Sequence, residues 1–173
     1  MRTPTSCLAV LAVLGLTLGA CTEEVDTPIP SDADSFAPTA EGTERSVVET
    51  DSAPEAVGPY SQAIQVGTRL YLAGQVALDP ETGERVSGGI EEETRQVMEN
   101  LGAVLEAAGF SFSDVVQAQV FLADLDDFEA MNQVYGSYFQ DAPPPARATI
   151  QAAAIPLDAL VEIMFIAEKS STH

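Results

Sequence analysis

The stretch IEEETRQVMENLGAVLEAAG, residues 90–109, is where the hydrophobic period of the chain changes from that of a strand to that of a helix. Its apolar residues recur at helical spacing, at Val97, Leu101, Val104, Leu105 and Ala108. Three glutamates occupy the first turn, where the positive end of the helix dipole favours acidic side chains. Gly109 is a residue type that commonly ends helices. The stretch therefore predicts an amphipathic helix.

Strand and helix patterns alternate on both sides of this helix. A second amphipathic helix is expected at residues 126–140, with its apolar side chains on one stripe. The expected strands are residues 46–50, the two halves of 61–78 on either side of Gly67-Thr68, 114–125, 146–153 and 160–168. The order ββ(β)αβαββ predicts an α+β fold, in which a single mixed β-sheet carries both helices on one face.

The last two strands predict where chemistry could take place. If they form an antiparallel pair around the loop at residues 153–158, Arg147 and Glu162 lie opposite one another on the same face. That pair is either a cross-strand salt bridge or part of a ligand site. The row that begins at Glu162 continues with Met164 and Ile166, which a solvated face does not usually carry. We expect a second subunit to cover this face; cover by the N-terminal hairpin is the alternative.

The first 21 residues have the features of an export signal. An apolar run ends at Ala20 and is shorter than the roughly 20 residues that a membrane span needs, which suits a signal peptide. The sequence LGAC at residues 18–21 resembles a bacterial lipobox, so Cys21 is the expected lipidation site. Ordinary cleavage without lipid, or a buried helix, are the alternatives. The expected location is the bacterial cell envelope or periplasm, with a lipid anchor in the membrane.

The composition of the chain indicates where the folded domain begins and which kinds of partner and site are not expected. Residues 22–45 are rich in Asp, Glu, Pro, Ser and Thr and predict a flexible tether, which leaves residues 46–173 as the folded domain. The chain has 27 acidic and 7 basic residues, and a net charge of −20 disfavours nucleic acid as a partner. Both cysteines lie near the N-terminus and the single histidine is His173. No metal site, cysteine nucleophile or Ser-His-Asp triad is expected.

Several motifs of the domain resemble one known family. They are APEAVGPYSQAI, LAGQVALDPETGE, VFLADLDDFEAMNQVYGSYF and PPARATIQAAAIPLDALVEIMFIA, and the resemblance extends over the folded part from about Ser46 to Lys169. In this order they resemble the RidA family of reactive intermediate deaminases. The resemblance implies a homotrimer with a chorismate-mutase-like fold and small-molecule clefts at the subunit interfaces. It also implies hydrolysis of enamines and imines, such as 2-aminoacrylate and 2-iminobutyrate, to 2-keto acids and ammonia without a cofactor.

The resemblance also implies roles for two charged residues. Arg147 matches the family's essential arginine, whose guanidinium would bind the substrate carboxylate through two parallel hydrogen bonds. Glu162 matches the family's glutamate, which would orient or deprotonate the attacking water. The expected enzyme is a 2-iminobutanoate/2-iminopropanoate deaminase-type hydrolase, with Arg147 and Glu162 as its catalytic residues.

Five further positions are expected to contact or shape the substrate cleft. Tyr60 would pack on the small side chain of the substrate, Asn132 would hold the cleft loops, and Gly74 would let the backbone approach the ligand. Loop packing for Tyr60 and a helix-surface or capping role for Asn132 are the alternatives. Ala73 and Thr149 stand where the family often has serine and cysteine.

These two departures leave a second function open. Together with the export signal, the loss of a serine hydroxyl at Ala73 is compatible with a non-catalytic, trimeric ligand-binding or holdase-like module on the same scaffold. Retention of both Arg147 and Glu162 favours the deaminase.

Overall fold

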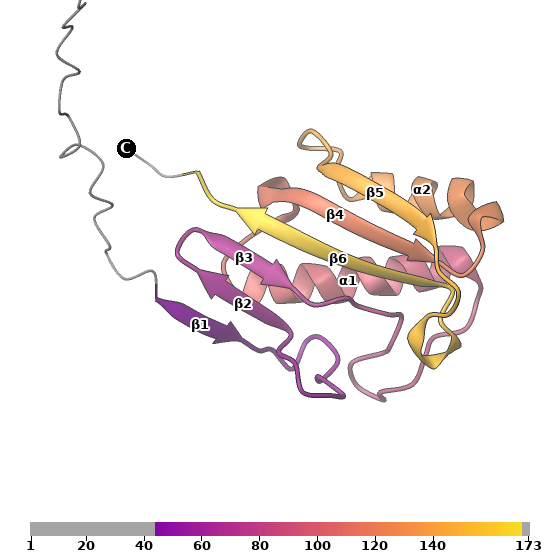
Figure 1. Ribbon diagram of the computed structural model, residues 1–173, viewed down its shortest axis with the longest axis horizontal. Helices are drawn as coiled ribbons and strands as arrows, with labels where there is room; N and C mark the ends of the chain where they lie inside the picture. Colours follow the sequence, from indigo (N-terminus) through magenta and orange to yellow (C-terminus); the bar gives the residue numbers. More distant parts are fainter. Residues whose placement is uncertain (1–43, 171–173) are drawn as a thin grey trace, which may run out of the picture. The chain divides into compact units, whose positions relative to one another are not determined.

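The computed structural model describes residues 44–170 of the 173-residue chain. Its strands and helices follow in the order that the sequence predicts (Figure 1). They are β1 (Arg45–Val48), β2 (Ala63–Val66), β3 (Arg69–Leu72), α1 (Ile90–Ala107), β4 (Val115–Leu122), α2 (Phe128–Ser137), β5 (Ala146–Gln151) and β6 (Val161–Glu168), with the single-turn 3-10 helices η2 (Phe112–Asp114), η3 (Leu125–Asp127) and η4 (Pro156–Asp158). The expected signal peptide, Cys21 and almost all of the expected tether lie outside the described residues.

One mixed sheet carries both helices on the same face, as predicted (Figure 1). Its strand order is β1-β2-β3-β6-β4-β5, and all neighbours are antiparallel except β4 and β5. The parallel pair follows from the connection, since parallel neighbours need a crossover and α2 lies between β4 and β5 in the chain. Neither helix of residues 44–170 is long and apolar enough to cross a membrane.

The predicted pairing of the last two strands is wrong. β4 lies between β5 and β6, because the helical crossover places β5 beside β4 while β6 pairs with the other edge of β4. Arg147 is next to Ala118 of β4, and Glu162 is next to Phe121 of the same strand. Ala118 and Phe121 are three positions apart, so their side chains point to opposite faces of the sheet. Arg147 and Glu162 therefore form no cross-strand pair within one chain.

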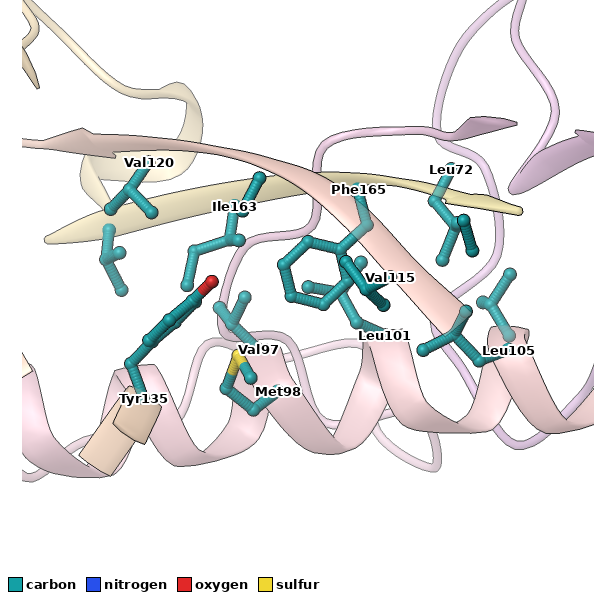
Figure 2. Close-up of a cluster of buried hydrophobic side chains, with 14 of the residues drawn as sticks. Leu72, Val97, Met98, Leu101, Leu105, Val115, Val120, Tyr135, Ile163 and Phe165 are labelled. Atoms are coloured by element: carbon teal, nitrogen blue, oxygen red, sulfur yellow. The ribbon is translucent and has the colours of Figure 1, made fainter. Parts of the chain in front are cut away.

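The hydrophobic core lies between the sheet and α1. Ile163 and Phe165 of β6 point toward α1 and meet Val97 and Leu101, and all four side chains are at most 1% exposed (Figure 2). Leu105, on the same stripe of α1, is also buried. The helical spacing that the sequence predicts is thus the spacing that faces the sheet.

The opposite face of the sheet is uncovered within the described residues. Met164 and Ile166 of β6 are only half-buried there, and their row continues through neighbours of the same face. Tyr71 of β3 is 41% exposed and Ile150 of β5 is 53% exposed. The hairpin formed by β2 and β3 extends the sheet beside β6 and does not fold across this face, so the alternative of cover by the hairpin is wrong (Figure 1).

Candidate functional site

All of the predicted catalytic and substrate-binding residues except Thr149 line one of two cavities, which have no lining residue in common. The first, here called the arginine cavity, has a volume of about 420 Å³ and is lined by Asn132, Tyr135, Gly136, Phe139, Pro144, Pro145 and Arg147. The second, the glutamate cavity, has a volume of about 350 Å³ and includes Tyr60, Ala73, Gly74 and Glu162 in its lining. Thr149 lines neither cavity; it lies two residues after Arg147 on the same face of β5.

Helix α2 holds the guanidinium of Arg147 in the arginine cavity. Nη2 of Arg147 donates a hydrogen bond to Oδ1 of Asn132 at 2.6 Å. The guanidinium carbon lies 4.6 Å from the centroid of the Tyr135 ring and 5.8 Å from that of Phe128, both within range of cation–π attraction. Asn132 thus contacts Arg147 directly, a role that the sequence did not predict. Among residues 44–170, Arg147 forms no salt bridge, so its charge is available to a ligand carboxylate.

Tyr135 is a contributor to the site that the sequence did not single out. Its position on the apolar stripe of α2 predicted a core residue, and its side chain is only 4% exposed. Its hydroxyl is buried without a hydrogen-bond partner in the described part of the chain. Burial raises the pKa of Tyr135 to about 12, although the nearby Arg147 acts in the other direction. The hydroxyl therefore stays protonated at neutral pH, and Tyr135 contributes its ring rather than a base.

The glutamate cavity places the Glu162 side chain against a glycine. A Cβ at Gly74 would lie 2.1 Å from Oε1 of Glu162, so only glycine leaves room for the carboxylate in this position. The backbone around Gly74 is fixed to β6, because Gln75 and Ile163 exchange hydrogen bonds of 2.9 and 3.1 Å between their main chains. Burial raises the pKa of Glu162. Gly74 thus shapes the site by accommodating Glu162, whereas the sequence predicted only close approach to a ligand.

The loop that carries Tyr60 is fastened by a buried glutamine. Gln62 is 4% exposed, and its Nε2 donates toward the carbonyl oxygens of Thr50, Ala53 and Pro54 at 2.8–3.1 Å. Tyr60 is 48% exposed, lines the glutamate cavity, and accepts a hydrogen bond from the Val57 amide at 3.3 Å. Tyr60 therefore lines this cavity and also packs within its own loop, while its contact with a substrate stays a prediction. Sequence reasoning missed Gln62, because its role depends on carbonyl groups that only the folded loop brings together.

The two cavities divide the chemistry between the two faces of the sheet. The arginine cavity offers a held cation, the group that recognises a carboxylate. The glutamate cavity offers a half-buried carboxylate, the group that can orient or deprotonate water. Because Arg147 and Glu162 point to opposite faces, the two groups of one chain do not meet in one cavity.

Comparison with known proteins identifies the family. The model of the family described as "Endoribonuclease L-PSP" matches residues 50–169. The 2-iminobutanoate/2-iminopropanoate deaminase of Mus musculus is 50% identical over 123 residues, which are 71% of this chain and 90% of the mouse protein. The crystal structure of RidA from the Antarctic bacterium Psychrobacter sp. PAMC 21119 has a TM-score of 0.69 and 45% identity, over 72% of this chain and 99% of that one.

A further solved structure, that of E. coli TdcF with bound serine, has a TM-score of 0.70 and 37% identity, and the match covers 72% of this chain and 99% of that one. The family match at residues 50–169 includes strands β2 to β6, both helices and both cavities described above. The fold, the motifs and the length of the match agree with the resemblance from which the site residues were predicted. The chain belongs to the Endoribonuclease L-PSP family, the family of the RidA deaminases.

Proposed function

We propose that the protein hydrolyses 2-imino acids and their enamine tautomers to 2-keto acids and ammonia. The observation that carries the proposal is the state of Arg147, whose guanidinium is held by an amide oxygen and two aromatic rings and is not neutralised by a carboxylate of the described residues. A planar cation held in this way suits a carboxylate that accepts two parallel hydrogen bonds. The mouse relative is named as a deaminase of 2-iminobutanoate and 2-iminopropanoate, both of which carry this group.

The catalytic site is proposed to form between subunits of a homotrimer. Arg147 and Glu162 point to opposite faces of the sheet, so one cleft can contain both only if they come from different chains. The uncovered face around Met164, Ile166 and Tyr71 supports such an assembly, since monomeric proteins rarely expose a contiguous apolar patch of this kind. The desolvated Glu162 carboxylate would then meet the arginine cavity of the neighbouring chain.

The proposed reaction needs one cation, one carboxylate and one water molecule. Arg147 fixes the carboxylate of the substrate and thereby orients its imine carbon. Glu162 accepts a proton as water attacks that carbon, and the C=N bond becomes a C–N single bond in a tetrahedral carbinolamine. The proton on Glu162 passes to the nitrogen and completes the carbinolamine. Glu162 then takes the hydroxyl proton and passes it to the same nitrogen, so that the C–N bond breaks and ammonia leaves as the C=O bond of the keto acid forms. Water and imine together thus balance keto acid and ammonia, without change of oxidation state.

Ala73 and Thr149 stand where the family often has serine and cysteine, which limits the residues that can take part in the reaction. Ala73 offers no hydroxyl, and its amide already donates to the Gln62 carbonyl at 2.9 Å. Thr149 retains a hydroxyl beside Arg147 on β5. Two carboxylates line the glutamate cavity, and the acid–base role is assigned to Glu162 because it is half-buried whereas Glu55 is exposed. The ribonuclease in the family description is not proposed for this chain, because its net charge is −20 and RNA would be repelled.

The proposal is tested by generating 2-iminobutyrate in place with an amino-acid oxidase and following the release of 2-ketobutyrate. We expect the wild-type protein to accelerate this release, and we expect Arg147→Ala to remove the acceleration. A wild-type protein without effect, or an equal effect of Arg147→Ala, would contradict the deaminase. Tight binding of 2-ketobutyrate without turnover would support the alternative, a non-catalytic ligand-binding module.

We also propose that the protein is exported and anchored by a lipid on Cys21. The support is the apolar leader and the lipobox-like sequence at residues 18–21. Cell fractionation after Cys21→Ser tests this proposal. The variant should move from the membrane fraction to the soluble fraction, and unchanged membrane association would exclude the lipid anchor.

A further inference from the structure

The turn between β5 and β6 carries an unusual leucine. Leu157 has φ 61° and ψ 23°, and the next residue, Asp158, has φ 52°. Residues other than glycine seldom adopt this left-handed conformation, which costs about 1–3 kcal/mol for each residue that is held in it. The side chain of Leu157 is nevertheless 57% exposed in one chain. Burial in the core therefore does not explain why an apolar residue occupies a strained position.

Leu157 lines the glutamate cavity together with Glu162. Two more exposed apolar side chains border the same cavity from the loop before β2, namely Val57, 76% exposed, and Tyr60, 48% exposed. The remaining lining is also mostly hydrocarbon, with Pro54, Val76, Leu78 and Pro156. Two loops far apart in the sequence thus direct apolar groups at the space in front of the Glu162 carboxylate. The volume of about 350 Å³ lies at the lower end of the range for ligand pockets, roughly 300–1,000 Å³.

We propose that Leu157 is a specificity-determining residue that contacts the side chain of the substrate and selects imino acids with apolar side chains. This inference rests on the proposed deaminase function. Glu162 must hold its water next to the imine carbon, and the substrate side chain is bonded to that same carbon. With the carboxylate directed to Arg147 of another chain, the side chain extends into the glutamate cavity, between Tyr60 and Leu157.

The chemistry of the cavity predicts the order of preference. Each methylene that leaves water for an apolar wall favours binding, which corresponds to roughly a three- to tenfold gain in kcat/KM. Carboxylate-bearing side chains are disfavoured, because Glu55 and Glu162 both line the cavity and would repel a second negative charge. The preferred substrates are therefore imines of amino acids with a longer hydrocarbon side chain, ahead of the imine of alanine.

The test compares two imines, generated in place by an amino-acid oxidase from alanine and from norvaline, with the full chain as the catalyst. The wild-type protein should have the higher kcat/KM for the norvaline imine. Leu157→Ser should lower the ratio of the two kcat/KM values by roughly three- to tenfold while activity on the alanine imine persists. Leu157→Gly, which removes the side chain and relieves the backbone strain, should lower the ratio equally and raise the melting temperature.

Leu125 provides the matched control, because it is 46% exposed and lines neither cavity. Leu125→Ser should leave the ratio unchanged. A wild-type protein active on the alanine imine whose ratio is unaffected by both Leu157 variants, or affected equally by Leu125→Ser, would overturn the specificity role and leave the deaminase intact. A wild-type protein that accelerates neither imine would overturn the deaminase and this inference with it.

Discussion

The charge of Arg147 remains available because its neighbours are an amide oxygen and two aromatic rings. Asn132 accepts one of its N–H groups, and the ring of Tyr135 lies 4.6 Å from the guanidinium carbon. An acidic neighbour would instead have competed with the substrate for the same donors. Helix α2 sets the orientation of the Arg147 guanidinium from one side, and the other N–H donors of the guanidinium remain for a carboxylate.

The Tyr135 ring should position Arg147 rather than take part in the reaction. Tyr135→Phe keeps the ring and removes a buried hydroxyl that lacks a partner, so activity should be nearly unchanged and stability unchanged or higher. Tyr135→Leu removes the cation–π contact and should raise KM by about 2- to 30-fold with a smaller effect on kcat. Steady-state kinetics on 2-iminobutyrate separate these effects. A fall in kcat alone in the leucine variant would contradict a positioning role.

The protonation of Glu162 should limit activity at acidic pH. Because burial raises its pKa, a larger fraction of the carboxyl is protonated at any acidic pH than for an exposed glutamate, whose pKa is about 4.3. Only the ionised form can accept a proton from water. On acidification, kcat/KM should therefore fall at a higher pH than an unperturbed glutamate would dictate. The residual activity of Glu162→Gln should lack this acid limb; an identical limb in the variant would exclude Glu162 as the base.

At the level of single residues, the sequence predicted the charged side chains of the site but not the residues that hold the site in place. Arg147 and Glu162 are recognisable because a cation and a carboxylate interrupt apolar strands and match family motifs. The contact of Tyr135 with Arg147 joins a helix to a strand, and the carbonyl groups around Gln62 come from a folded loop. No local pattern specifies such contacts, since they depend on how the elements pack.

Helix α1 is fastened to the start of β6 through a buried carboxylate. Oε2 of Glu93 accepts a hydrogen bond from the Leu160 amide at 2.7 Å, and its other oxygen accepts one from Arg85. The Glu93 side chain is 2% exposed, whereas that of Arg85 is 37% exposed. This contact lies two residues before Glu162, so it also fixes the strand that presents the proposed base.

Loss of this contact should destabilise the protein measurably. Glu93→Ala leaves the partly buried Leu160 amide without a partner and a cation without its carboxylate, and should lower the free energy of unfolding by about 2–4 kcal/mol. Urea unfolding at a fixed protein concentration measures the change. Glu92→Ala is the control, because its pair with Arg95 is exposed at 3.5 Å and should contribute less than about 1 kcal/mol. Equal changes in the free energy of unfolding for the two substitutions would contradict the proposed role of Glu93 in linking α1 to β6.

At the level of elements, the periodicity of the sequence predicted the type and order of the helices and strands better than it predicted which strands pair. The apolar stripe over residues 90–109 corresponds to α1, because one side of that helix is buried against the sheet. The pairing of β5 with β6 was wrong, because alternation along a strand shows which residues share a face but not which strand lies alongside. The expected helix at 126–140 is shorter as α2, since η3 takes up its first turn and Asp124 accepts a hydrogen bond from the Asp126 amide.

The uncovered apolar face is the feature of the whole molecule that one chain does not explain. In one chain it exposes Tyr71 and Ile150 and leaves Met164 and Ile166 half-buried. The sequence predicted this face from the apolar middle of the last strand, and a partner was expected to cover it. The alternation of side chains along the strand does not show which surface of the partner covers this face. A contact between subunits produces no periodic pattern in the sequence.

The oligomer should depend on this face. Light scattering on residues 46–173 should give the mass of a trimer. Ile166→Lys places a charge in the middle of the face and should shift the mass toward that of a monomer, because an unpaired buried charge is strongly unfavourable. Leu125→Lys, at an exposed position in η3, should leave the trimer intact. A wild-type protein that scatters as a monomer would contradict the proposed assembly.

The proposed catalytic site combines Arg147 of one chain with Glu162 of another. Arg147→Ala and Glu162→Gln should each be nearly inactive when expressed alone. When the two variants are co-expressed and assemble at random, about a quarter of the interfaces receive an intact Arg147 from one chain and an intact Glu162 from the next. Release of 2-ketobutyrate from 2-iminobutyrate should therefore recover in the mixture. Co-expressed variants that remain inactive, while wild type co-expressed with either variant is active, would contradict a catalytic site that is shared between subunits.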